Sequence, residues 1–66
     1  MKNVLKVERG KLDGTQHELA NRVGVSRQTI NSIEAGRYVP STVLAIKLSQ
    51  VFNTTVNAIF QLEEGD

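Results

Sequence analysis

The sequence predicts an all-α domain built from five short helices. Its apolar residues recur at helical spacings, and no segment has the strict alternation typical of a half-buried strand. Four of the expected helices follow a serine or threonine that can cap a helix N-terminus, namely Thr15, Ser26, Ser41 and Thr55. Glycine, the residue that most often ends a helix in the left-handed conformation, follows two of them.

The first helix is expected over about residues 3–12 and is the least regular of the five. Its apolar residues fit a single face poorly; they are Val4, Leu5, Val7 and Leu12. Glu8 stands where an apolar residue would be expected. The pattern therefore predicts this helix less firmly than the others.

The second helix is expected over about residues 16–23. Thr15 and Glu18 have the spacing of a capping box, in which each side chain accepts a hydrogen bond from the other residue's backbone. Three apolar residues, Leu19, Ala20 and Val23, then share one face. Gly24 supplies the left-handed stop.

The third helix is expected over about residues 27–35, after the cap Ser26. Ile30 and Ile33 lie three residues apart and so share one face, and Gly36 ends the segment. The remaining residues of this helix are mostly polar. One side should therefore be buried and the other should face solvent.

Two further helices follow Pro40, the only proline. Ser41 caps the first of them, and Asn53 can close it. Its apolar residues follow the amphipathic i, i+4, i+7, i+8 spacing; they are Leu44, Leu48, Val51 and Phe52. Thr55 caps a short last helix that carries Val56, Ile59 and Phe60.

Length and composition bound the class of protein. Sixty-six residues make one domain, 1–66, without cysteine, so disulfides and a structural zinc site are excluded and packing or self-association must supply stability. No apolar run approaches the roughly 20 residues that span a bilayer, and charge interrupts the first residues too early for a signal peptide. We expect a cytoplasmic protein without a membrane partner.

Charge is unevenly distributed, although the net charge is only +1. Residues 1–60 hold all eight lysines and arginines against four acidic residues, and 63–66 form an acidic tail. We expect no enzyme, metal site or cofactor, because the single histidine, His17, has no paired-carboxylate cleft, cysteine nucleophile or glycine-rich phosphate loop beside it.

Residues 16–35 have the pattern of a helix-turn-helix. Ala20 is small enough for the second helix of the pair to cross closely over the first, and Gly24 permits the sharp turn between them. Val25 is expected to fill the turn. An ordinary helical hairpin would not need both small residues at these places.

On these residues the chain resembles the Cro/repressor-type (Xre-like) helix-turn-helix transcriptional regulators, in their short single-domain form. The resemblance runs from about Leu5 to Leu62. It is carried by TQ..LA at 15–20, VSRQTI at 25–30, IEAGRY at 33–38 and PS at 40–41. It implies a five-helix domain that binds double-stranded DNA as a homodimer.

The outward side of the third helix carries the candidate base-reading residues, Arg27, Gln28, Asn31 and Ser32. Arginine can bind guanine O6 and N7 with two hydrogen bonds, and glutamine or asparagine can do the same to adenine. A recognition helix enters the major groove with its N-terminal residues foremost, which favours the first two of the four.

A second set of residues is expected to contact the DNA backbone: Thr15, Gln16, Ser26, Thr29, Arg37, Tyr38 and Ser41. Gln16 begins a helix whose free N–H groups and dipole favour a phosphate. In the similar repressors the matching glutamine also braces the glutamine of the next helix, here Gln28. Tyr38 could equally cover the edge of the core.

The resemblance also implies an internal ion pair between Arg9 and Glu34, which would tie the first helix to the third. Two residues depart from the family pattern. Gly14 and Glu8 stand where similar sequences have core hydrophobic residues, and we expect Val7 and Leu12 to fill the gap by a shift of the first helix.

Dimerisation is expected because one such domain reads only a few base pairs. The apolar cluster at the end of the chain, Val56, Ile59, Phe60 and Leu62, is the candidate interface. Similar repressors pair their termini as a two-stranded ribbon, which here would join about residues 2–4 to 61–63.

The predicted function is therefore that of a sequence-specific DNA-binding regulator, in the first instance a repressor, which binds a palindromic operator as a homodimer. The rival hypothesis is a protein-interaction module, such as an antitoxin-like or adaptor domain, for which the acidic tail could provide a contact. Binding to a duplex that weakens steeply with salt would distinguish the two.

Overall fold

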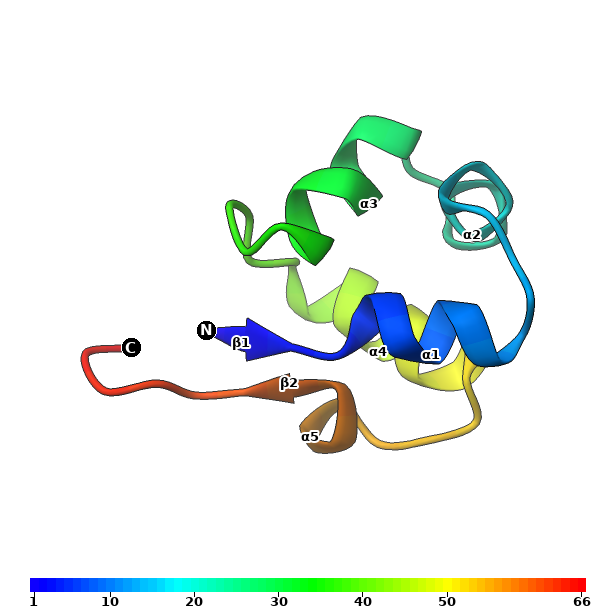
Figure 1. The fold of residues 1–66 in the computed structure, drawn as a ribbon. Helices are drawn as coiled ribbons and strands as arrows, with labels where there is room; N and C mark the ends of the chain where they lie inside the picture. The colour runs from blue at the N-terminus through cyan, green and yellow to red at the C-terminus, as the bar shows by residue number, and fades with distance from the viewer.

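The computed structural model describes residues 1–66 and consists of five helices and a small two-stranded sheet (Figure 1). The elements in chain order are β1 (Lys2–Asn3), α1 (Leu5–Lys11), α2 (Gln16–Val23), α3 (Arg27–Glu34), α4 (Thr42–Val51), α5 (Val56–Ile59) and β2 (Phe60–Gln61). The predicted five-helix domain is confirmed. None of these helices has both the length and the apolar character needed to cross a lipid bilayer.

The helix N-termini form at the residues that the sequence marks. Thr15 Oγ1 accepts from the Glu18 N–H at 3.1 Å, and Glu18 Oε1 accepts from the Thr15 N–H at the same distance, which completes the capping box. Ser26, Ser41 and Thr55 each accept from the backbone N–H three residues on. Gly24 ends α2 with φ +76°, a conformation that costs glycine little.

Every helix contributes to a single core. Its ten apolar members are Leu5, Leu19, Ala20, Val23, Ile30, Ile33, Leu44, Leu48, Ile59 and Phe60. α1 contributes only Leu5, whereas α2 contributes three residues of its apolar face. The apolar side of α3, Ile30 and Ile33, is fully buried, so the opposite side of that helix faces outward.

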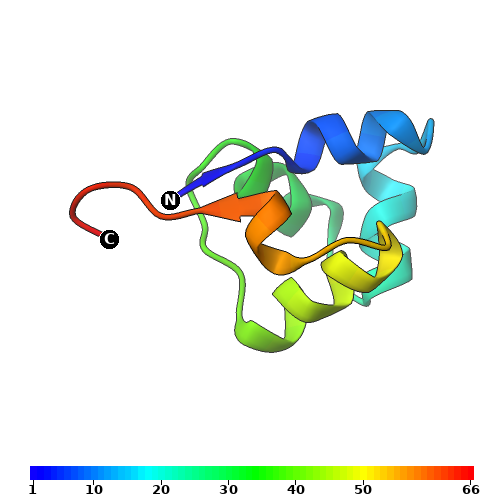
Figure 2. The ribbon, with the colours of Figure 1, turned by 90° about the horizontal axis from the view of Figure 1, so that it is seen from below.

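The chain termini lie side by side and pair as a ribbon (Figures 1 and 2). β1 and β2 are antiparallel, with Lys2 opposite Gln61 and Asn3 opposite Phe60. The predicted ribbon is thus present, displaced by one residue at its C-terminal strand. α1 starts later than expected because Asn3 is in the strand and its Oδ1 accepts from the Leu5 N–H at 3.1 Å.

The acidic tail continues beyond β2 and curls back toward the N-terminus (Figures 1 and 2). The α-amino group of Met1 lies 3.0 Å from a carboxylate oxygen of Glu63 and 3.0 Å from one of Asp66. Hydrogen bonds to Asp66 and then Glu63 raise the pKa of that amino group. Part of the tail's negative charge is therefore paired within the chain.

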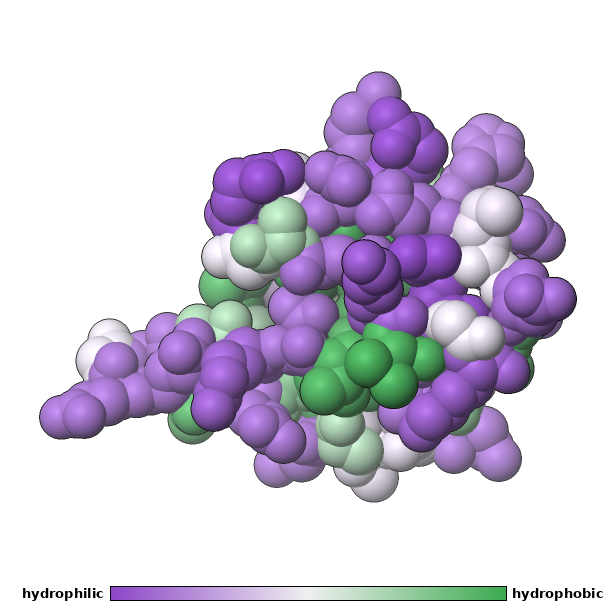
Figure 3. Space-filling model, viewed as in Figure 1, coloured by the Kyte–Doolittle hydropathy of each residue, from purple (hydrophilic) through white to green (hydrophobic).

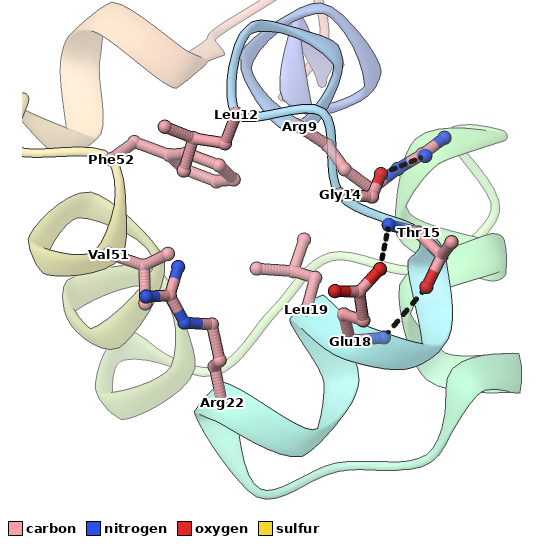
Figure 4. Close-up of a pocket in the computed structure, with 9 residues that line it drawn as sticks. All are labelled: Arg9, Leu12, Gly14, Thr15, Glu18, Leu19, Arg22, Val51 and Phe52. Atoms are coloured by element: carbon pink, nitrogen blue, oxygen red, sulfur yellow. Dashed lines mark hydrogen bonds between the residues drawn. The ribbon is translucent and has the colours of Figure 1, made fainter.

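The expectation that Val7 and Leu12 fill the space near Gly14 is wrong. The two residues are 58% and 51% exposed, and α1, which spans only seven residues, buries Leu5 instead. A groove of about 320 Å³ remains beside Gly14 between α1, α2 and α4. Figure 4 shows Leu12 and Phe52 along one side of it and the Arg22 side chain next to Val51 along another.

Glu8, the second departure from the family pattern, does not need an apolar partner. Its carboxylate accepts from Lys11 Nζ at 3.3 Å, within the same helix. The residue is half-buried and its charge stays at the surface. The buried core of α1 is formed by Leu5 alone.

Candidate nucleic-acid interface

α2 and α3 are packed at a steep angle around the turn at Gly24. In Figure 1 α2 is seen nearly end-on, whereas α3 is seen from the side. Val25 is half-buried against the core, and Ile30 and Ile33 fix α3 from its inner side. This geometry is that of a helix-turn-helix, in which the first helix supports the second and leaves the outer side of the second helix free.

The outer side of α3 is polar and open to solvent. Arg27 and Gln28 are exposed, and Asn31, Ser32 and Thr29 are partly exposed. Figure 3 shows that the surface over α3 and α2 is hydrophilic, while the apolar surface on this side lies lower, toward α1. The candidate base-reading residues thus all reach the surface of one helix face.

Helical spacing divides these residues into two stripes. Arg27 and Asn31 are four residues apart and form one stripe, and Gln28 and Ser32 form the other. The second stripe lines a hollow of about 340 Å³ together with Thr29, Arg37 and Tyr38. The first stripe faces α2.

Gln16, the first residue of α2, links the first stripe to the interior. Its Oε1 accepts from Arg27 Nη1 at 3.3 Å and from Asn31 Nδ2 at 3.4 Å, and its Nε2 donates to Glu34 Oε1 at 3.1 Å. No hydrogen bond joins Gln16 to Gln28, so the brace that the family resemblance implies is absent; Gln28 lies on the other stripe and lines the hollow with Tyr38.

Arg9 and Glu34 form an ion pair between α1 and α3. Arg9 Nε donates to Glu34 Oε2 at 2.7 Å and Nη2 donates to Oε1 at 3.1 Å, while Nη1 donates to the Gly14 carbonyl at 2.9 Å. The Glu34 side chain is only 5% exposed. Burial acts to raise the pKa of Glu34, but the hydrogen bonds from Arg9 and Gln16 outweigh it and the pKa is lowered.

The candidate backbone-contacting residues lie around α3. The hydroxyl groups of Thr15, Ser26 and Ser41 cap helices, and Ser26 also shares a hydrogen bond with Thr29 at 3.0 Å. Arg37 Nη2 donates to Asn31 Oδ1 at 3.2 Å, and Tyr38 is about half exposed. All seven of these residues reach the surface at least in part.

A polar hollow lies at the N-terminus of α2, beside Gln16 and Arg27. Its lining contains no apolar residue, and Asp13 is its one carboxylate. His17 also lines this hollow. Its side chain is exposed, and its Nε2 lies 3.4 Å from Nδ2 of Asn21. No group of three or more potential metal ligands occurs in the chain.

The candidate dimer interface needs correction. Ile59 and Phe60 are 0% and 8% exposed, because both pack into the core of their own chain. Val56 is half-buried and Leu62 is 80% exposed, so these two offer most of the accessible surface of the four residues.

The sequence reasoning missed other exposed apolar residues, Val39, Val43 and Ile46. Val39 and Ile46 line a groove of about 210 Å³ that also includes Val56 and the edge of Phe60. For two of them the sequence gives a signal. Val43 and Ile46 lie outside the face of α4 that Leu44 and Leu48 bury.

Comparison with known proteins agrees with this architecture. A helix-turn-helix family model matches residues 5–65. An uncharacterised HTH-type transcriptional regulator of Archaeoglobus fulgidus is 47% identical over the whole chain and 93% of its own length. A similar regulator of Methanocaldococcus jannaschii is 46% identical over the full length of both chains. The regulator YgzD of Bacillus subtilis is 44% identical over 97% of each chain.

Proposed function

The chain belongs to the helix-turn-helix family of transcriptional regulators, and on this premise we propose that it binds double-stranded DNA sequence-specifically, with α3 in the major groove. The single observation that carries the proposal is the exposed polar side of α3. It projects Arg27, Gln28 and Asn31 from a helix that two buried isoleucines hold in place.

Base readout follows from the chemistry of these side chains. The guanidinium group of Arg27 fits the O6 and N7 atoms of guanine, and the amides of Gln28 and Asn31 fit adenine. Asn31 already bonds Gln16 and Arg37, yet its amide nitrogen and oxygen each keep one free hydrogen-bonding position. Ser32 adds a hydroxyl group that can bind either kind of base.

Backbone contacts would set the register of the protein on the duplex without reading its sequence. The free N–H groups at the start of α2, beside Thr15 and Gln16, favour a phosphate on one side of α3. Ser26 and Thr29 lie at the start of α3 itself. Arg37, Tyr38 and the N-terminus of α4 at Ser41 would contact phosphates on the other side.

We propose further that two copies bind a palindromic site and repress transcription. One α3 reads too few base pairs for a genome, and a two-fold pair doubles the site with half-sites about 34 Å apart. Such a pair would bury the exposed residues Val43, Ile46 and Leu62 together with the half-buried Val56. A dimer bound over a promoter would block the polymerase by occupancy alone.

Selection from a random duplex pool tests the DNA-binding proposal. We expect one palindromic motif to be enriched, and its affinity to fall with salt by a log–log slope of about −0.9 for each phosphate contacted. Several contacts therefore give a slope steeper than about −2. Enrichment of no motif, or a flat salt dependence, would instead favour the rival interaction module.

Dimerisation has its own test in the substitution Ile46→Asp. A charge placed in the proposed interface should convert a dimer into a monomer in sedimentation at micromolar concentration, and should weaken binding to the palindrome roughly 100-fold through lost avidity. The matched control is Val7→Asp, at another exposed apolar residue, which lies on α1 outside the proposed interface. A wild-type monomer, or equal effects of both variants, would contradict this interface.

A further inference from the structure

We propose that the groove beside Gly14 binds a small monocarboxylic acid with an apolar body, and that Arg22 holds its carboxylate. This Gly14 groove has a volume of about 320 Å³ and is lined by the nine residues drawn in Figure 4. They come from α1, α2, α4 and the adjoining turns, and none comes from α3. Ligand binding at this place is therefore separate from the DNA binding proposed above and does not depend on it.

The Gly14 groove is open because residue 14 has no side chain to fill it. Similar sequences have a core hydrophobic residue at this position. A Cβ atom added to Gly14 would meet only the carbonyl oxygen of Arg9, 4.0 Å away, and Leu12 remains half exposed instead of filling the space. The volume lies at the lower end of the range of roughly 300–1,000 Å³ found for small-molecule sites, so a compact ligand suits its size.

Apolar side chains form the walls of the Gly14 groove. Figure 4 shows Leu12 and Phe52 together on one side, Leu19 facing them, and Val51 at the end next to Arg22. Leu19 is buried, and Val51 and Phe52 are half-buried. An aliphatic chain placed between these side chains would leave water, and each methylene group that enters should tighten binding by about two- to fourfold.

Arg22 is the one charged residue of the lining whose side chain has no partner. Arg9 is bound to Glu34, and Glu18 accepts a hydrogen bond from a backbone N–H group at the N-terminus of α2. Arg22 takes part in none of the four ion pairs of the chain, and its guanidinium group makes no hydrogen bond. The planar N–H donors of that group match a carboxylate in geometry as well as in charge. An apolar acid is thus the class of ligand that suits both the walls and the free cation.

NMR titrations of the wild-type protein at neutral pH test this site with hexanoate, hexanol and hexylammonium, which share one alkyl chain and differ in head group. We expect saturable shifts of Leu19, Val51 and Phe52, with a dissociation constant of about 1 mM for hexanoate. Hexanol should bind about two- to fivefold more weakly, because an ion pair with an exposed arginine contributes only modestly, and hexylammonium should bind most weakly. The absence of saturable shifts at these residues, or tightest binding of hexylammonium, would overturn the proposal.

Arg22→Met separates the contribution of the head group from that of the alkyl chain. The substitution keeps an apolar side chain but removes the guanidinium group, so the affinity for hexanoate should fall to that for hexanol, which should stay unchanged. The control is Lys2→Met, which removes an exposed cation of β1 outside the lining and should keep the preference for hexanoate. Equal loss of that preference in both variants would mean that the overall charge attracts the acid, and would overturn the role of Arg22.

Gly14→Leu tests the place of the ligand by supplying the missing side chain. The backbone at Gly14 is not left-handed, so leucine is tolerated there, and its side chain would occupy the space of the ligand. We expect hexanoate to bind at least about tenfold more weakly and the variant to melt at a higher temperature. The control is Gly10→Leu, the same substitution at an exposed position of α1 outside the lining, which should keep the wild-type affinity. A folded Gly14→Leu protein that binds hexanoate as tightly as wild type would overturn the proposal, and if this variant does not fold, the Arg22→Met comparison decides.

Discussion

Replacing Arg9 with methionine is expected to destabilise the folded domain by about 3 kcal/mol, the usual cost of leaving one partner of a buried ion pair alone. Methionine keeps most of the length of the side chain but donates no hydrogen bond. Glu34, whose side chain is 95% shielded from solvent, would retain only Gln16 as a partner. A 66-residue domain has roughly 3–10 kcal/mol of total stability, so a large fraction of the variant should be unfolded at 37 °C.

Thermal and urea unfolding, followed by circular dichroism, measure this loss. The control is Lys11→Met, which removes another α1 cation, one that pairs with Glu8 from a mostly exposed position. Surface pairs of that kind contribute about 0–1 kcal/mol, so this variant should stay close to wild type. Equal losses in the two variants would show that the Arg9–Glu34 contact has no special part in stability.

The Arg9–Glu34 pair also predicts how the free energies of unfolding of wild type and Arg9→Met should change with pH. In wild type the pKa of Glu34 is lowered, so its contribution to stability is complete above the unfolded glutamate pKa of about 4.3 and is lost as the pH falls through the folded value. Without Arg9, its hydrogen bonds and charge no longer lower the pKa of Glu34, so this pKa should be higher in the variant than in wild type. Acidification from pH 7 should then stabilise Arg9→Met relative to wild type, and the gap between their unfolding free energies should narrow.

The parts of this fold that are predictable from the sequence are the local ones. A capping box needs only Thr15 and Glu18 three residues apart, and the turn needs only a glycine at position 24. Such signals depend on a few neighbouring residues, so the bounds of α2 and α3 agree closely with expectation. The apolar face of α3 is equally local, because Ile30 and Ile33 are one helical turn apart.

The errors all concern contacts between distant segments. Ile59 and Phe60 look available in the sequence, but the pairing of β1 with β2 draws them into the core. The partners of Gln16 depend on which stripe of α3 faces α2, a rotation that residue spacing within one helix does not specify. The ion pair of Arg9 with Glu34 came from family resemblance, since no pattern in the chain joins residues 25 apart.

Replacing Arg27 with alanine should abolish discrimination at one base pair of the operator, whereas replacing Arg37 should weaken all duplexes alike. Arg27 can make two hydrogen bonds to a guanine, and such a contact discriminates against other bases by about 1–3 kcal/mol. Arg37 follows α3 and carries a charge suited to a phosphate, so its loss should make the log–log salt slope shallower by about one. Affinities for matched and scrambled duplexes at several salt concentrations separate the two effects.

The comparison between the two arginines is informative because both variants remove one positive charge from the same side of the domain. Arg22→Ala controls for charge alone, since the Arg22 side chain lies in the groove against Val51, away from the polar face of α3 (Figure 4). If Arg27→Ala and Arg37→Ala lost affinity for matched and scrambled duplexes in the same proportion, α3 would contribute charge without reading bases. If only Arg27→Ala brings the two affinities together, the guanidinium group at the start of α3 reads the sequence.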